Sequence, residues 1–210
     1  SDLNITTMEL TIRKTDRKNY SQTENLTREA FWNLYKPGCD EHLVLLQLRE
    51  SSSYVEELDL IAIYENEIVG HIISTKAKVI DTLNTEHEVL CVGPISVSPS
   101  FQSKGIGTKL LNYSISEAKN SGFKGMILFG NPDYYHRFGF RNAQEYGITT
   151  KEGLNFEPFM ALELQKNGLV NVKGSFFEAE AFTTGEDEFI EFEKQFPYKE
   201  KLVTETQFKH

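Results

Sequence analysis

A strand, a glycine-containing loop, a helix and a second strand follow one another over residues 88–129, and this succession constrains the fold more than any other part of the chain. Residues 88–97 are rich in β-branched and apolar side chains. From Ile106 the apolar residues recur at helical spacing until Gly122, and the apolar run 125–129 follows directly. Because a helix that joins two strands of one sheet in this way leaves them parallel, the pattern predicts a βαβ unit.

The loop between the first strand and the helix contains Gly105 and Gly107. Glycines let backbone N–H groups approach a ligand closely, and the start of a helix adds unpaired N–H groups and the positive end of its dipole. The loop therefore predicts an anion site. It is not a P-loop, because the required Gly-Lys-Ser/Thr is absent, and it is not a dinucleotide fingerprint, because Leu110 stands where the third glycine should be.

Pro94 interrupts the first strand of this unit. Proline has no backbone N–H to donate to a neighbouring strand. One edge of the strand must therefore be unpaired or bulged near Pro94.

The rest of the chain shows shorter periodic segments. They predict a strand over 8–15, helices over 23–35 and 40–50, a hairpin of 58–64 with 68–80, strands over 159–164 and 176–182, and an acidic helix over 186–196 that ends before Pro197. Asp40 is the candidate cap of the second helix. We expect residues 1–7 to be a processed end, 8–182 to form one domain, and 183–210 to be an acidic helical extension, acting as a lid, a dimer contact or packing.

Composition narrows the class of protein. A chain of 210 residues with 39% hydrophobic side chains can bury the core of one domain. No segment reaches the roughly 18 consecutive apolar residues of a membrane helix and no signal sequence is visible, so we expect a cytoplasmic protein without a membrane partner. A net charge of −9 argues against nucleic acid and would attract a cationic molecule. Cys39 and Cys91 lack metal-ligand spacing, so no metal is expected.

Three motifs in order carry a resemblance to a known family. They are Gly93-Pro-Ile-Ser-Val-Ser-Pro99, the loop Gln102-Ser-Lys-Gly-Ile-Gly107, which fits Gln/Arg-x-x-Gly-x-Gly/Ala, and Asn131-Pro-Asp-Tyr-Tyr-His-Arg-Phe-Gly-Phe140. Together they resemble the GNAT superfamily of N-acetyltransferases, and more narrowly its YhbS-like branch. Shorter segments such as Val69-Gly-His71 extend the likeness over most of residues 8–182.

The resemblance implies an α/β (α+β) fold whose mixed, mostly antiparallel sheet is flanked by helices and has a splayed parallel strand pair at the cofactor site. It implies transfer of an acetyl group from acetyl-CoA to a primary amine by direct attack in a ternary complex. The alternative is a non-catalytic acyl-CoA-binding regulatory module that keeps the loop without turnover. The acceptor stays open between a small molecule and a peptide, and the protein between a monomer and a homodimer.

The resemblance also assigns site residues. Backbone N–H groups of the loop would hold the diphosphate of coenzyme A, namely those of Gln102, Ser103, Lys104, Gly105, Ile106, Gly107 and Thr108. The pantetheine arm would lie along Ile95, Ser96 and Val97, and Asn131 would either contact that arm or cap the next helix. Tyr135 is the candidate proton donor to the leaving thiolate, with Tyr134 as its neighbour and alternative.

Two parts of the site stay open in the sequence. The general base could be His71, Glu88, Asp133, His136 or a water held by main-chain carbonyls, although His71 fits a buried histidine better. The acceptor pocket should come from 23–50 and the late strands, where Phe31, Trp32, Tyr35 and Arg49 are available.

Overall fold

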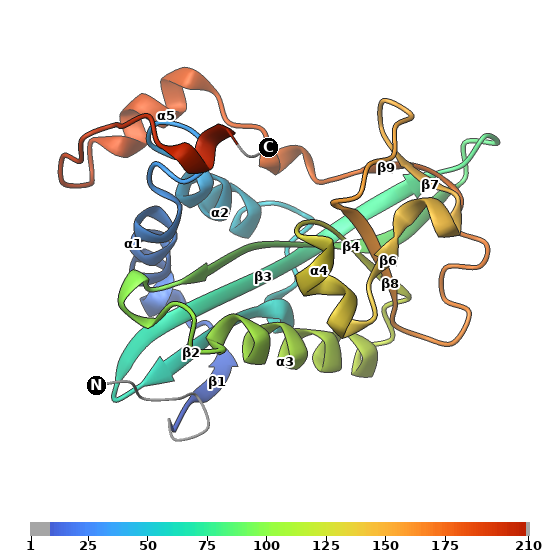
Figure 1. Cartoon of the computed structure of the whole chain (residues 1–210), viewed down its shortest axis with the longest axis horizontal. Helices are drawn as coiled ribbons and strands as arrows, with labels where there is room; N and C mark the ends of the chain where they lie inside the picture. Colours follow the sequence, from blue (N-terminus) through green and yellow to red (C-terminus); the bar gives the residue numbers. More distant parts are fainter. Residues whose placement is uncertain (1–8, 209–210) are drawn as a thin grey trace.

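The computed structural model describes residues 9–208, so the expectations for residues 1–7 and for Met8 lie outside the described part of the chain. The fold is a mixed sheet with helices on both faces (Figure 1). Helices α1 (Tyr20–Phe31), α2 (Glu41–Arg49) and α5 (Glu186–Glu193) lie on one side, and α3 (Ile106–Asn120) lies on the other. Among the described residues no helix is long and apolar enough to cross a membrane.

Nine described strands form the sheet, in the order β1-β2-β3-β4-β5-β8-β6, with β9 beside β3 and β7 beside β9. Pairing is antiparallel except for β4 with β5 and β7 with β9. The mixed, mostly antiparallel sheet and the parallel βαβ unit are thus confirmed. The strands are β1 (Thr11–Lys14), β2 (Asp59–Tyr64), β3 (Glu67–Ile80), β4 (Glu86–Val97), β5 (Gly125–Phe129), β6 (Arg141–Asn142), β7 (Ile148–Thr150), β8 (Phe159–Glu163) and β9 (Gly174–Phe177).

The prediction of a strand over 176–182 was wrong in its bounds. The strand β9 ends at Phe177, and residues 180–182 form a short 3-10 turn. The alternation of Phe and Ala with Glu continues past the strand, but β9 loses its partner there because its pairing with β3 ends at Lys78. The short strands β6 and β7 were not predicted, since two or three residues are too few for a periodic signal.

Helix α3 (Ile106–Asn120) closes one face of the sheet. Its buried side chains Ile106, Leu110, Leu111, Ile115 and Ala118 pack into the largest apolar cluster of the described chain. The cluster is completed from β2, β3, β4, β5 and β8 by residues such as Leu60, Ile72, Leu90, Met126 and Met160. This packing fixes the start of α3 against the end of β4.

Helices α1 (Tyr20–Phe31) and α2 (Glu41–Arg49) cover the other face. Val44, Leu45 and Leu48 of α2 pack on Ile73 of β3. Asp40 precedes α2 but makes no side-chain cap, which corrects the sequence expectation. Its carboxylate is used elsewhere, by the Thr184 hydroxyl at 2.8 Å and the Lys36 ammonium at 3.3 Å.

A buried polar cluster ties these two helices to the sheet, and its centre is the fully buried Asp59 of β2. Asp59 accepts hydrogen bonds from Arg49 Nε at 2.9 Å and from His71 Nε2 at 2.6 Å. Thr15 and Tyr54 donate to it at 2.8 and 2.7 Å. Burial alone would raise the pKa of Asp59, but the hydrogen bonds and charges of His71 and Arg49 outweigh it and hold that pKa well below its usual value. The cluster is therefore an ionised carboxylate enclosed by donors.

The segment after β9 returns over α1 and α2, as the red ribbon above these helices shows (Figure 1). Its helix α5 (Glu186–Glu193) places Phe189 and Phe192 edge-on against the His42 ring of α2, and Phe196 follows. Glu193 accepts from Arg28 Nε at 2.7 Å and contacts His42 Nε2 at 3.2 Å. The first three acidic residues of α5 are exposed, whereas Glu193 is held by these partners, so this segment packs against the domain.

Replacing Asp59 by Asn should destabilise the fold by about 3 kcal/mol, because the buried Arg49 charge would keep only its longer ion pair with Glu24, at 3.7 Å. Asp16→Ala removes an exposed ion pair with Arg13 and should cost less than about 1 kcal/mol. Urea unfolding followed by fluorescence measures both. Equal losses for the two variants would contradict the central role of Asp59.

Candidate active site

Strands β4 and β5 touch for only part of their length. Their parallel pairing is confined to Leu90 with Met126 and Cys91 with Ile127. Beyond Cys91, residues 92–97 of β4 have no partner in β5, while β5 continues to pair with β8 up to Phe129. The two strands therefore diverge and leave main-chain groups facing a gap.

Pro94 lies where the divergence begins. On the other edge of β4, Ile72 pairs with Ile95 and Ser74 pairs with Val92, so Gly93 and Pro94 together oppose Ile73. This is a β-bulge, in which two residues of one strand face one residue of its neighbour. The sequence expectation of an unpaired or bulged edge at Pro94 is confirmed.

The glycine loop lies at the end of the gap. Gly105 takes φ +83°, a left-handed backbone that a side chain would strain, and α3 starts at Ile106. Gln102 Nε2 donates to the Val97 carbonyl at 3.3 Å and so links the loop to the end of β4. The unpaired N–H groups of the first turn of α3 are thus placed beside the open end of β4, as an anion site requires.

Helix α4 (Pro132–Tyr135) brings the two tyrosines to this region. The Tyr134 hydroxyl is 2.7 Å from the Thr108 hydroxyl in the first turn of α3. Asn131 caps α4 by accepting from the Asp133 N–H at 3.0 Å. Its capping role is therefore observed, and a contact with a ligand stays a prediction.

Tyr135 turns the other way, into a cavity of about 410 Å³ between β4 and β5. A Cβ at Gly130 would overlap its ring, so a glycine is needed for the ring to lie on the backbone there. Burial, and to a lesser degree the neighbouring Tyr134 and Tyr35, raise the pKa of Tyr135 to about 12. The phenol is therefore protonated at neutral pH.

Several elements meet around this cavity. Its walls are Phe31, Tyr35, Asp40, Glu41 and Val44 on the α1–α2 side, residues 91–95 of β4, Leu128 and Phe129 of β5, Tyr135, and Glu178 and Phe182 after β9. Phe31 and Tyr35 were expected here. Trp32 and Arg49 were expected as well but lie elsewhere, since Trp32 donates to the Glu200 carbonyl at 2.9 Å and Arg49 belongs to the Asp59 cluster.

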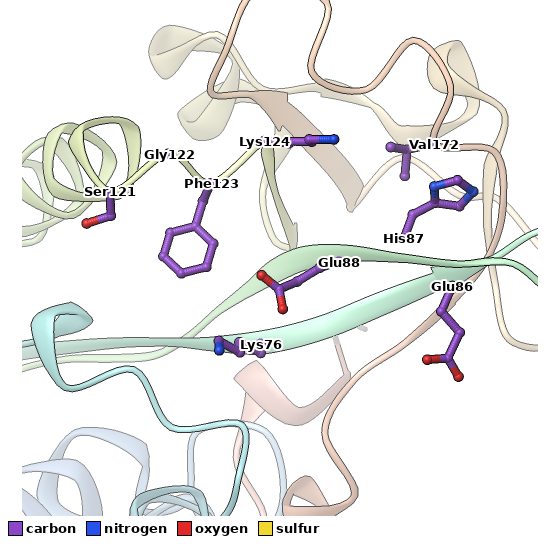
Figure 2. A pocket seen from close by; sticks show the side chains of 9 residues that line it. All are labelled: Lys76, Glu86, His87, Glu88, Ser121, Gly122, Phe123, Lys124 and Val172. Carbon is purple, nitrogen blue, oxygen red and sulfur yellow. The ribbon is translucent and has the colours of Figure 1, made fainter.

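The four sequence candidates for a general base do not line this cavity. His71 is fully buried against Asp59, which agrees with the reading of it as a buried histidine. Asp133 and His136 are exposed. Glu88 lies on the wall of a separate cavity of about 440 Å³ with Lys76, His87 and Lys124, where Figure 2 shows no tyrosine or glycine-loop residue.

Three carboxylates line this cavity instead, and none of them was an individual site candidate in the sequence. Asp40 and Glu41 stand at the start of α2, and Glu178 follows β9. Burial raises the pKa of Glu41 and of Glu178. Asp40 and Glu41 lie within residues 23–50, from which the sequence predicted the acceptor pocket, and this was a usable signal. No sequence signal pointed to Glu178, because only the return of the chain over the sheet places it on the cavity wall.

Comparisons with known proteins agree with this geometry. The sequence model of the Acetyltransferase (GNAT) family matches residues 22–140. The uncharacterized N-acetyltransferase YjhQ of Escherichia coli is 27% identical over 136 residues, which are 65% of this chain and 72% of that protein.

Two solved structures share the fold. The GNAT family N-acetyltransferase YhbS of Escherichia coli, in complex with CoA, has a TM-score of 0.74 at 19% identity and covers 84% of this chain and 93% of its own. A GNAT family acetyltransferase of Brucella melitensis, in complex with acetyl-CoA, has a TM-score of 0.69 at 24% identity. The match covers 84% of this chain and 99% of that one.

Gln47 of α2 holds one wall of the cavity, because its Nε2 donates to the Ala181 and Thr183 carbonyls at 2.9 Å each. We expect Gln47→Ala to speed amide hydrogen exchange at Phe182 and Thr183 by about tenfold, the effect of losing roughly 1.4 kcal/mol of local hydrogen bonding. Gln165→Ala removes a similar pair of bonds at the end of α3 and serves as the control. Equal exchange in all three proteins would show that Gln47 does not anchor the wall.

Proposed function

This chain belongs to the acetyltransferase (GNAT) family, and we propose that it moves the acetyl group of acetyl-CoA to a primary amine by direct attack within a ternary complex. Membership in the family makes it an acetyl-CoA-dependent acetyltransferase. The choice of a primary amine and the direct mechanism are the proposal. The observation that carries it is the strand gap, which joins an anion site at one end to a cavity with a buried tyrosine at the other.

The diphosphate of coenzyme A would bind the backbone of residues 102–108. Gly107 supports this placement, because a Cβ there would meet only Val97 at 3.8 Å and the Tyr134 hydroxyl at 4.0 Å. A phosphate group can therefore approach the start of α3 closely. We assign Gln102 to Thr108 to this role, with Asn131 as a further contact through its carboxamide.

The pantetheine arm would pair with the edge of β4 that β5 leaves unpaired. Residues 95–97 of β4 present main-chain groups toward the gap, and an amide-containing chain can pair with them as a strand would. Ser96 directs its side chain away, since its hydroxyl is buried and donates to Thr27 at 3.3 Å. The main chain of Ile95, Ser96 and Val97, not their side chains, would therefore bind the arm and lead the thioester to Pro94 and Tyr135.

Tyr135 would stabilise the departing sulfur. In the reaction a carbon–nitrogen bond forms, the carbon–sulfur bond breaks, and the amine loses a proton. Full transfer from a phenol with a pKa of about 12 to a thiolate with a pKa near 8.5 is unfavourable. Tyr135 would therefore act first by donating a hydrogen bond to the sulfur as negative charge develops there.

The acidic side chains of the cavity wall would accept the proton of the amine. Glu41 and Glu178 line the cavity that contains Tyr135 and can accept a proton directly or through water. Their raised pKa values bring them closer to neutrality, where a base accepts and releases protons most readily. A non-catalytic acyl-CoA-binding module would need the loop and the gap but neither the buried phenol nor these carboxylates.

A carboxylate at Gly107 tests the diphosphate site. Gly107→Glu should weaken acetyl-CoA binding by at least tenfold in calorimetry, because it fills the approach to the helix start and repels the phosphates. Gly107→Ala is the matched control, since its methyl group fits the available space, and it should bind within about twofold of the native protein. Position 105 is less suitable, because any side chain there is strained at φ +83°. Native affinity in Gly107→Glu would refute the assignment.

Substitutions that remove one hydroxyl at a time distinguish the roles of Tyr134 and Tyr135. Tyr135→Phe should lower kcat by about 100-fold while acetyl-CoA binding is retained, because a hydrogen bond to the charge that develops on the sulfur contributes about that much. Tyr134→Phe loses the bond to Thr108 and should mainly weaken acetyl-CoA binding. Thiol release across a panel of amines gives kcat. The opposite pattern would make Tyr134 the donor, and tight binding without turnover of any amine would favour the regulatory module.

A further inference from the structure

We infer that the acceptor carries a second positive charge besides its reacting amine, and that Glu41 and Glu178 recognise the two charges. This inference rests on the proposed function, since it concerns the acceptor side of the same cavity. It narrows the substrate class to chains with two cationic groups, either small diamines and polyamines or peptides with adjacent basic residues.

All charged side chains on the cavity wall are acidic. The wall includes Asp40, Glu41 and Glu178 but no lysine, arginine or histidine. Asp40 is already compensated, by the Lys36 ammonium at 3.3 Å and the Thr184 hydroxyl at 2.8 Å. Across residues 9–208 no ion pair forms at Glu41 or Glu178. Glu41 accepts a hydrogen bond from the Asp40 N–H at 3.2 Å, and the charges of Lys36 and Lys151 partly offset the raised pKa of Glu41 and of Glu178. Because neither lysine pairs with these glutamates, both carboxylates can still bind a cationic ligand.

The two carboxylates without an ion pair lie at different places on the wall. Glu41 acts on Tyr35, whose pKa is raised by burial and then by the Glu41 charge. Glu178 acts on Cys91 of β4, whose pKa is raised by burial and then by the Glu178 charge. One carboxylate is enough to attract a reacting ammonium, so the other is available to a second cation.

Partial removal of a carboxylate from water disfavours its charge, more at the half-buried Glu41 than at Glu178, whose side chain is exposed. Burial raises the pKa of Glu41, and it raises that of Glu178 although this side chain keeps access to solvent. A bound ammonium would stabilise each ionised form. The aromatic side chains Phe31, Tyr35, Phe129 and Phe182 line the same cavity and can add cation–π attraction.

The cavity is also open at the Glu178 end. A neighbouring cavity of about 370 Å³ shares Phe129 and Glu178 with it and continues past the exposed Leu154 and Phe156. Its wall carries Lys151, but also Glu152 and Glu180, so acidic side chains outnumber the one lysine there. A cationic chain longer than the first cavity can therefore extend beyond Glu178. A compact amine with one charge would leave Glu178 without a partner.

The test compares two amines that differ in one charge, using the full chain and saturating acetyl-CoA. We expect kcat/KM for 1,4-diaminobutane to exceed that for 1-aminobutane by at least tenfold at low salt, with a smaller ratio at high salt because ions screen the attraction. A second arm compares lysine peptides with and without a neighbouring arginine, which distinguishes a small acceptor from a peptide.

Charge-neutral variants identify the recognising groups. Glu178→Gln and Glu41→Gln should each reduce the preference for the dicationic acceptor by about five- to tenfold, mostly through KM. Glu50→Gln, at the other end of α2, and Glu157→Gln, on an exposed loop outside both cavities, are the matched controls and should keep the preference.

Failure of this inference differs from failure of the proposed function. If the protein does not bind acetyl-CoA, the proposed function is refuted. Turnover of amines with equal kcat/KM for one and two charges, or a preference unchanged in both glutamine variants, would overturn the inference and leave the function intact. If no amine is acetylated, calorimetry with the CoA complex decides, because diaminobutane that binds no more tightly than aminobutane also overturns it.

Discussion

The divergence of β4 from β5 after Cys91 is the constraint on which the rest of the site depends. A strand in a sheet normally has its main-chain groups satisfied on both edges, and here one edge of residues 92–97 is left to another partner. The bulge at Gly93 and Pro94 turns the strand at that point, and the βαβ connection places the start of α3 at its end. In the proposed function, this one irregular strand would set the direction of the bound cofactor and the positions of its anionic and reactive ends.

The opposite side of the cavity depends on how α1, α2 and the C-terminal segment are attached. The Asp59 cluster holds α2 through Arg49, and Glu193 links the C-terminal helix to Arg28 and His42. Gln47 fixes the chain between them to α2. These contacts are polar and specific, so they determine which side chains face the acceptor. The proposed donor side is built from backbone, whereas the proposed acceptor side is built from side chains on separately attached elements. This difference explains how one donor site can be combined with different acceptors.

The sequence predicted the central part of the fold well because its signals are local. The βαβ unit, the hairpin of β2 and β3, and the helices appear in the structure close to their expected positions, and Pro94 marked the gap correctly. The errors share a physical cause. The strand over 176–182 ends early where its partner ends, Asp40 bonds to a residue far along the chain instead of capping its helix, and Trp32 and Arg49 pack away from the cavity. Each error concerns a partner distant in sequence, which local patterns do not encode.

By itself the sequence determined the family, and it predicted the loop as an anion site and Tyr135 as the candidate phenol, because each of these depends on residues near one another in the chain. Only the tertiary structure decided which tyrosine faces the cavity: Tyr134 bonds to Thr108, and Tyr135 lies against Gly130 at the strand gap. Only the tertiary structure excluded the sequence candidates for a base from the cavity wall and placed Glu41 and Glu178 there. Those carboxylates come from segments more than 130 residues apart (178 − 41 = 137), and they meet because the chain returns over the sheet after β9.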